Sequence, residues 1–120
     1  MSETKKSAIL MEINIDAVGT FRAYTKASSD TILAEIPEYM RGGICRYILL
    51  GIKPGSFLTA VIAGERFIAE RRADDFNAKI IDTYFDFFRS ECPAGSHGTP
   101  RKVQDWCEIG GLIGMQGRGK

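Results

Sequence analysis

The stretch covering residues 36–77 constrains the fold most, because two apolar helix-forming runs flank a Lys-Pro-Gly-Ser turn within it. Pro37 suits the first turn of a helix, where its missing N–H costs nothing. Apolar residues then recur at helical spacing up to Gly51, which ends this helix. Ser56 is a natural N-cap for the second helix, which ends near Gly64. The stretch therefore predicts two helices joined by a tight turn.

Three later segments also carry helix signals. Residues 65–72 begin a short helix, and residues 76–91 show the strongest helical periodicity in the chain before Pro93 stops it. Thr99 as N-cap, followed by proline, opens a last helix that ends at Gly110. We therefore predict a mainly α, compact domain of about four helices over residues 31–109.

The two ends of the chain have a different pattern. Residues 1–30 form an N-terminal arm or hairpin in this prediction, because apolar side chains recur at every second position over residues 9–16, and that period of two is typical of a strand. The residues that carry the alternation are Ile9, Met11, Ile13 and Ile15. Residues 21–25 would return as a partner strand, giving a small β-hairpin, and a flexible arm is the alternative. Residues 110–120 are Gly-rich and basic, which predicts a flexible tail.

Composition limits the classes of function. A length of 120 residues fits one domain, and small helical chains often gain stability by oligomerising. A net charge of +1 argues against binding a nucleic-acid polymer or a membrane surface. No apolar run reaches the ~20 residues that cross a bilayer. Three cysteines without a CxxC pair favour a reducing compartment. We therefore expect a soluble cytoplasmic protein.

Catalytic and metal-binding patterns are weak. His97 is the only histidine, and no set of nucleophile, base and orienting group is visible around it. Cys92, His97 and Cys107 lack the spacing of a zinc site and have no evident fourth ligand. We therefore expect neither an enzyme, nor a metal centre, nor a cofactor.

The central region resembles a pattern found in small proteins of tailed bacteriophages. The shared features keep their order and spacing between Ile36 and Trp106. They are residues 36–40, 46–48 and 51–61, then Ala73, Asp74 and Asn77, then Pro93, Gly98 and Thr99, and finally Val103 and Trp106. These small phage proteins are similar to the anti-CBASS sponge proteins, which sequester cyclic nucleotide signals of bacterial immunity. The resemblance implies a helical homo-oligomer, a dimer or tetramer, that holds 3′3′-cGAMP or a related cyclic dinucleotide between subunits in the host cytoplasm without cleaving it. It assigns no individual binding residue.

Such a ligand presents phosphates, ribose rings and base faces, so its site needs cationic or N–H donors and flat side chains. The turn formed by Lys53, Gly55 and Ser56 offers a helix N-terminus, room for close approach and an ammonium group. Arg41 and Arg46 of the preceding helix are expected to face the same opening. The alternative is an ordinary connecting turn with solvated cations.

A second anion site is predicted in the loop that contains His97 and Thr99. Lys102 lies in the first turn of the helix that follows, where a basic residue opposes the helix dipole. That conflict indicates an anion, and the alternative is a capped loop with surface charges.

Other polar and aromatic residues are candidates for contacts with bases and ribose. Asp74 and Asn77 share one helical face, although local capping is the more common role of such residues. Tyr47 and Phe57 are candidate stacking groups, as are Tyr39 and Trp106, although aromatics at helical spacing are more often core. A different hypothesis is a phage protein that binds and inhibits a host protein through its N-terminal hairpin and its tail.

Overall fold

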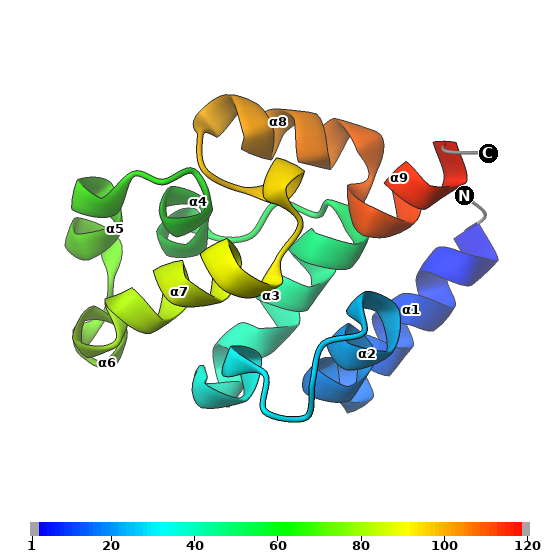
Figure 1. The fold of residues 1–120 in the computed structure, drawn as a ribbon, viewed down its shortest axis with the longest axis horizontal. Coiled ribbons are helices and arrows are strands. Elements are labelled where there is room, and N and C mark those ends of the chain that lie inside the picture. The colour runs from blue at the N-terminus through cyan, green and yellow to red at the C-terminus, as the bar shows by residue number, and fades with distance from the viewer. Residues whose placement is uncertain (1–2, 119–120) are drawn as a thin grey trace.

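The computed structural model describes residues 3–118, and over that range the chain is mainly helical, with no β-strand (Figure 1). The prediction of a mainly α fold is confirmed, but the predicted number of about four helices was too low. The nine α-helices and two 3₁₀ helices of the described range are α1 Glu3–Ile15, α2 Ala17–Thr25, η1 Ile32–Glu35, α3 Glu38–Leu50, α4 Ser56–Ile62, α5 Arg66–Arg72, α6 Asp75–Lys79, α7 Ile81–Glu91, η2 Ala94–Ser96, α8 Pro100–Ile109 and α9 Gly111–Arg118.

Helix α3 passes through the centre of the molecule (Figure 1). Helices α1, α2 and α9 pack against it, and α4 packs against α5, α7 and α8. The residues of α3 that match the predicted helical stripe, Ile44, Tyr47 and Ile48, have no exposed surface. The predicted helix in this part of the sequence is therefore the central element of the core.

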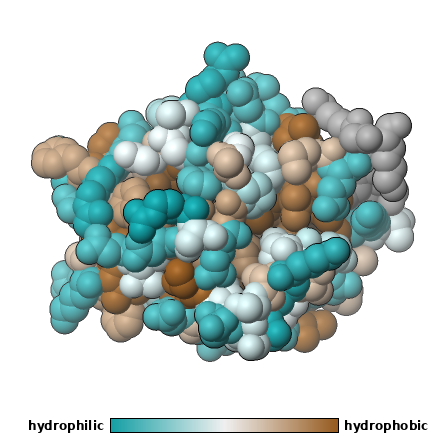
Figure 2. Space-filling view, in the orientation of Figure 1, coloured by the Kyte–Doolittle hydropathy of each residue, from teal (hydrophilic) through white to brown (hydrophobic). Residues whose placement is uncertain are grey.

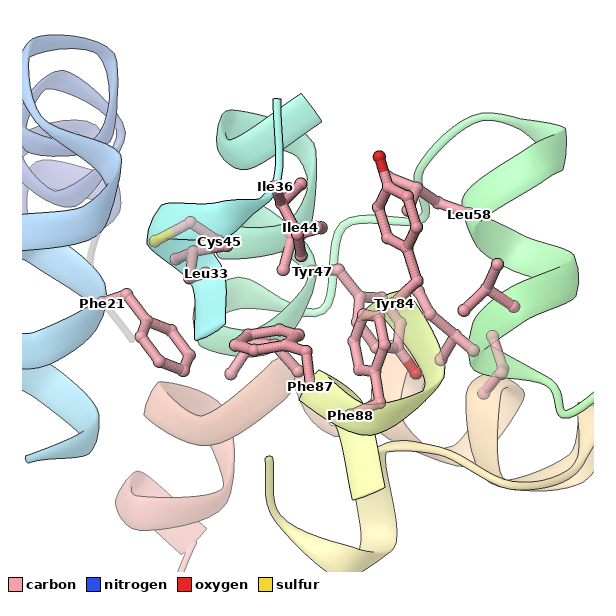
Figure 3. Close-up of a cluster of buried hydrophobic side chains, with 14 of the residues drawn as sticks. Phe21, Leu33, Ile36, Ile44, Cys45, Tyr47, Leu58, Tyr84, Phe87 and Phe88 are labelled. Carbon is pink, nitrogen blue, oxygen red and sulfur yellow. The ribbon is translucent and has the colours of Figure 1, made fainter. Parts of the chain in front are cut away.

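Aromatic side chains join the two sides of the molecule (Figure 3). The ring centroids of Phe21 in α2 and Phe87 in α7 are 5.3 Å apart, and Phe87 and Phe88 form an edge-to-face pair at 5.1 Å. Phe57 of α4 meets Tyr84 of α7 edge-on at 5.2 Å. Since buried aromatic pairs in these geometries add to the stability given by area burial, they tie α7 to both halves of the core.

The predicted N-terminal β-hairpin is wrong, because α1 and α2 occupy its place. Ile9 and Ile13 are 1% and 2% exposed, whereas Met11 and Ile15 are 65% and 79% exposed. Aliphatic residues spaced by two contain pairs spaced by four, so the same pattern fits one face of a helix. Asp16 then caps α2 by accepting a hydrogen bond from the Gly19 N–H at 2.9 Å. Helices α1 and α2 therefore pack on the core through Ile9, Ile13 and Phe21 and do not form a separate arm.

The prediction of a flexible C-terminal tail is also wrong for the described part of it, since α9 packs against α3. Ile113 is buried in the core. Gly51 and Gly111 both have positive φ, 70° and 69°, and their backbones are so close that a Cβ on Gly111 would lie 2.5 Å from the Gly51 nitrogen. The glycines therefore serve a close contact between α9 and the end of α3. Residues 119–120 lie outside the described range.

Replacing Gly111 with alanine is expected to destabilise the protein. The left-handed backbone alone costs an alanine about 1–2 kcal/mol, and the contact with Gly51 adds to that. Gly117→Ala in the same helix is the matched control, because a Cβ there meets nothing within 4 Å. Urea denaturation should show a lower free energy of unfolding for Gly111→Ala and an equal or higher one for Gly117→Ala. Equal stability of the two variants would contradict the close contact.

Candidate functional site

A polar groove lies between the corner that joins α1 to α2 and the N-terminal half of α3. It is lined by residues 13–18 on one side and by five residues of α3 on the other, and it has a volume of about 280 Å³. The α3 residues are Glu38, Tyr39, Arg41, Gly42 and Arg46. The structure thus brings both predicted arginines together, with an aromatic side chain beside them.

The two arginines of the groove have different environments. Arg41 donates from Nε to the Ile36 carbonyl and from Nη2 to the Ala34 carbonyl, both at 2.8 Å, so it fixes the chain after η1. Within the described residues, the Arg46 guanidinium makes no hydrogen bond or ion pair. A Cβ on Gly42 would lie 3.0 Å from Arg46 Nη1, so glycine gives this guanidinium its place over the helix. Arg46 therefore has all five donors available to an anion.

Tyr39 presents an oriented aromatic ring at the groove. The side chain is 65% exposed, yet its hydroxyl donates to Asp74 Oδ2 at 2.8 Å and accepts from Asn77 Nδ2 at 3.3 Å. The hydrogen bond to Asp74 raises the pKa of Tyr39. A hydrogen bond from the Asn77 N–H, together with that from Tyr39, lowers the pKa of Asp74. The ring is therefore held by its hydroxyl while its faces stay accessible.

Asp74 and Asn77 have the capping role that was weighed against ligand binding. Asp74 caps α6 by accepting from the Asn77 N–H at 2.7 Å. Asn77 is 3% exposed and accepts from the Tyr84 hydroxyl at 2.6 Å. Its side chain cannot reach a ligand at the surface, so the prediction of Asn77 as a contact residue is wrong.

Tyr47 and Phe57 belong to the core. The Tyr47 side chain is fully buried, and its hydroxyl donates to the Ser96 carbonyl at 2.5 Å. Burial raises the pKa of Tyr47 strongly. Phe57 is 8% exposed and packs on Tyr84. Neither ring is available for stacking, and the prediction of these two residues as contact residues is wrong, as it is for Trp106, which is 4% exposed.

The structure does not bring the predicted turn together with the two arginines. Lys53 follows the C-terminal end of α3 and lines a separate pocket of about 560 Å³ between α4 and α8. Glu65 and Glu108 line the same pocket, so its charge does not favour an anion. Gly55, not Ser56, is the N-cap of α4, and no side chain caps that helix.

The second predicted loop is a capped loop, in agreement with the alternative. The Thr99 hydroxyl caps α8 by accepting from the Lys102 N–H at 3.1 Å. Lys102 Nζ donates to the Ala94 carbonyl at 3.5 Å, which accounts for a basic residue in the first turn. His97 is half-buried, with Nδ1 3.1 Å from Ser96 Oγ. Pro100 reaches the pocket that contains Lys53, but His97, Thr99 and Lys102 do not line it.

The sequence analysis missed the α1–α2 corner as one wall of the groove. Asp16 is the one residue whose type indicates this corner, because aspartate is a common N-cap and could begin a helix at residue 17. The strand interpretation hid this signal. Gly42, which is costly in a helix interior, accommodates the Arg46 guanidinium, and no local sequence pattern indicates this role.

Within the described residues, no group of three or more His, Cys, Asp or Glu side chains has the geometry to hold a metal ion. The three cysteines are free thiols, and burial raises the pKa of Cys45 to about 12. Over the same range, no helix is long and apolar enough to span a membrane. No protein family, curated protein or solved structure matches this chain.

The single histidine provides a pH test of the second loop. Burial lowers the pKa of His97 below its ordinary value of about 6.5. Between about pH 7 and pH 5 the unfolded chain therefore takes up a proton before the folded one, and the free energy of unfolding falls as the pH falls. Urea titrations should show a smaller fall for His97→Gln than for the wild type. Parallel pH curves for the two proteins would contradict this burial of the ring.

Proposed function

We propose that the protein is a phage immune-evasion protein that binds a cyclic nucleotide immune signal, such as 3′3′-cGAMP, without cleaving it. The proposal begins from the resemblance to the anti-CBASS sponge proteins. The observation that carries it is the unpartnered Arg46 guanidinium in a groove that also contains Arg41 and the exposed ring of Tyr39. The groove replaces the Lys53 turn as the proposed site.

The chemistry of the groove matches the parts of such a ligand. Arg46 offers charge-assisted, bidentate hydrogen bonds to a phosphate, which Arg41 can extend with the donors that it does not use on the backbone. Tyr39 offers a face for base stacking. The carboxylates of Asp16 and Glu38 are acceptors that suit ribose hydroxyls and the exocyclic amino group of guanine.

The size of the groove supports binding between subunits. Its volume of about 280 Å³ is at the lower limit of ordinary ligand pockets, which have about 300–1,000 Å³. One copy of the chain therefore encloses about one nucleotide half of a cyclic dinucleotide, and a second copy in a homo-oligomer binds the other half.

The alternative of a phage protein that inhibits a host protein has one specific observation in its favour. Phe67 of α5 and Phe76 of α6 are 71% and 58% exposed. Figure 2 shows, however, that hydrophobic residues on the visible face are interspersed with hydrophilic ones, whereas docking surfaces usually form larger apolar patches. The hairpin and tail that were expected to make such contacts are packed helices.

Arg46→Gln is expected to weaken binding of 3′3′-cGAMP. The loss of charge-assisted hydrogen bonds to phosphate costs about 1.5–3 kcal/mol, which is roughly 10- to 100-fold in the dissociation constant. Isothermal titration calorimetry measures this, with the recovered nucleotide checked by chromatography for intactness. Arg72→Gln is the matched control, since Arg72 is an exposed arginine outside the groove.

Equal affinities of the Arg46 and Arg72 variants would refute the site. A hydrolysed nucleotide would refute sequestration. If no cyclic dinucleotide binds the wild type, the host-protein hypothesis is favoured.

A further inference from the structure

Helix α1 has a second apolar face that points away from the core. Its inner face carries the buried residues Ile9 and Ile13. Its outer face, which we call the α1 stripe, consists of Thr4, Ala8, Met11 and Ile15, all exposed. Met11 and Ile15 are 65% and 79% exposed, and α1 lies at the edge of the molecule (Figure 1). Spacings that alternate between four and three residues are typical of a helix–helix seam.

We propose that the α1 stripe pairs with the α1 stripe of a second copy of this chain, in antiparallel orientation. A two-fold interface requires one surface to be complementary to itself. With the two-fold axis between residues 9 and 10, Ile15 of each copy lies opposite the partner's Thr4, and Met11 opposite the partner's Ala8. Large side chains then face small ones along the seam, the arrangement in which two helices interdigitate.

The charges beside the stripe favour the same orientation. Lys5 and Glu12 lie seven residues apart on one flank of the stripe, and Ser7 and Asn14 lie on the other. An antiparallel pair places each Lys5 beside the partner's Glu12, because residues on one flank stay on that side of the dimer. A parallel pair lacks this match, because it brings opposite flanks together and so places Lys5 beside the partner's Ser7.

Apart from Glu3 in the first turn, the charges along α1 are in an order that is unfavourable for an isolated helix. Glu12 lies in the last turn, which has no basic residue, and Lys5 and Lys6 lie near the start. Helix dipoles prefer the opposite order. An antiparallel partner offsets this, because it brings each end of α1 beside the oppositely charged half of its neighbour.

The α1 stripe also leads to the groove. Ile15 belongs to the stripe and lines the groove with Arg46, so the proposed pairing sets the first turn of the partner's α1 beside the groove. A single pair of 13-residue helices is small compared with standard interfaces, so the dimer is expected to depend on concentration. The proposal is based on the α1 stripe and does not depend on the ligand proposed above.

Sedimentation equilibrium of the full chain over a concentration series tests the proposal. The wild type is expected to show a monomer–dimer equilibrium. Ile15→Glu places a charge in the seam and should raise the dissociation constant about tenfold or more. Phe67→Glu is the matched control, since it also replaces an exposed apolar residue but lies on α5. A wild type that stays monomeric, or equal effects of the two variants, would overturn the proposal.

Charge exchange tests the orientation. Lys5→Glu alone and Glu12→Lys alone should each raise the dissociation constant of the dimer roughly two- to fivefold per ion pair lost. The double exchange should restore the wild-type value. Because Glu12 also accepts a hydrogen bond from the Tyr24 hydroxyl at 3.2 Å, Tyr24→Phe controls for the loss of that bond. A double exchange that dimerises no better than the single variants would rule out the antiparallel pairing.

Discussion

The buried Tyr47 side chain is the constraint on which the rest of the structure depends. It lies in α3 with no exposed surface, its hydroxyl donates to the Ser96 carbonyl, and its own carbonyl accepts from Trp106 Nε1 at 3.0 Å. These two bonds join α3 to η2 and to α8. Leaving a buried phenol or indole without a hydrogen-bond partner is costly, so these two bonds fix the positions of η2 and α8 relative to α3. Helix α9 then closes on the end of α3 through the Gly51–Gly111 contact. The groove depends on this arrangement, because α3 carries both of its arginines.

The sequence allowed the elements with strong local signals to be predicted. Helix α8 begins at the Thr99 cap and ends at a left-handed Gly110, as expected from capping chemistry. Helix α3 ends at Gly51 for the same reason. Helix α1 was not predicted, because isoleucines spaced by two satisfy a strand and a helix equally. The role of Gly111 depends on a neighbour 60 positions earlier, Gly51, and no local pattern contains that information.

The candidate site was predictable only in part, for a related reason. Residue types and spacing identified Arg41 and Arg46, but not that Lys53 belongs to a different pocket. That separation follows from the length of α3, which carries the turn away from the N-terminal half of the helix. Tyr47 and Asn77 have side chains that suit a ligand, and the core uses the same hydrogen-bonding groups. Burial decides between these roles, and it depends on the packing of the whole chain. The α1–α2 corner, which forms the second wall, could not be predicted from a strand interpretation.

The central claim is that the groove at Arg46 binds the nucleotide, and amide chemical-shift mapping with 3′3′-cGAMP tests it most directly. The account predicts that the largest perturbations occur at the amides of Gly42 and Ala17, which line the groove, while that of Gly98 in the second loop changes little. Perturbations centred on Gly98 and Lys102, with Gly42 and Ala17 unaffected, would contradict it.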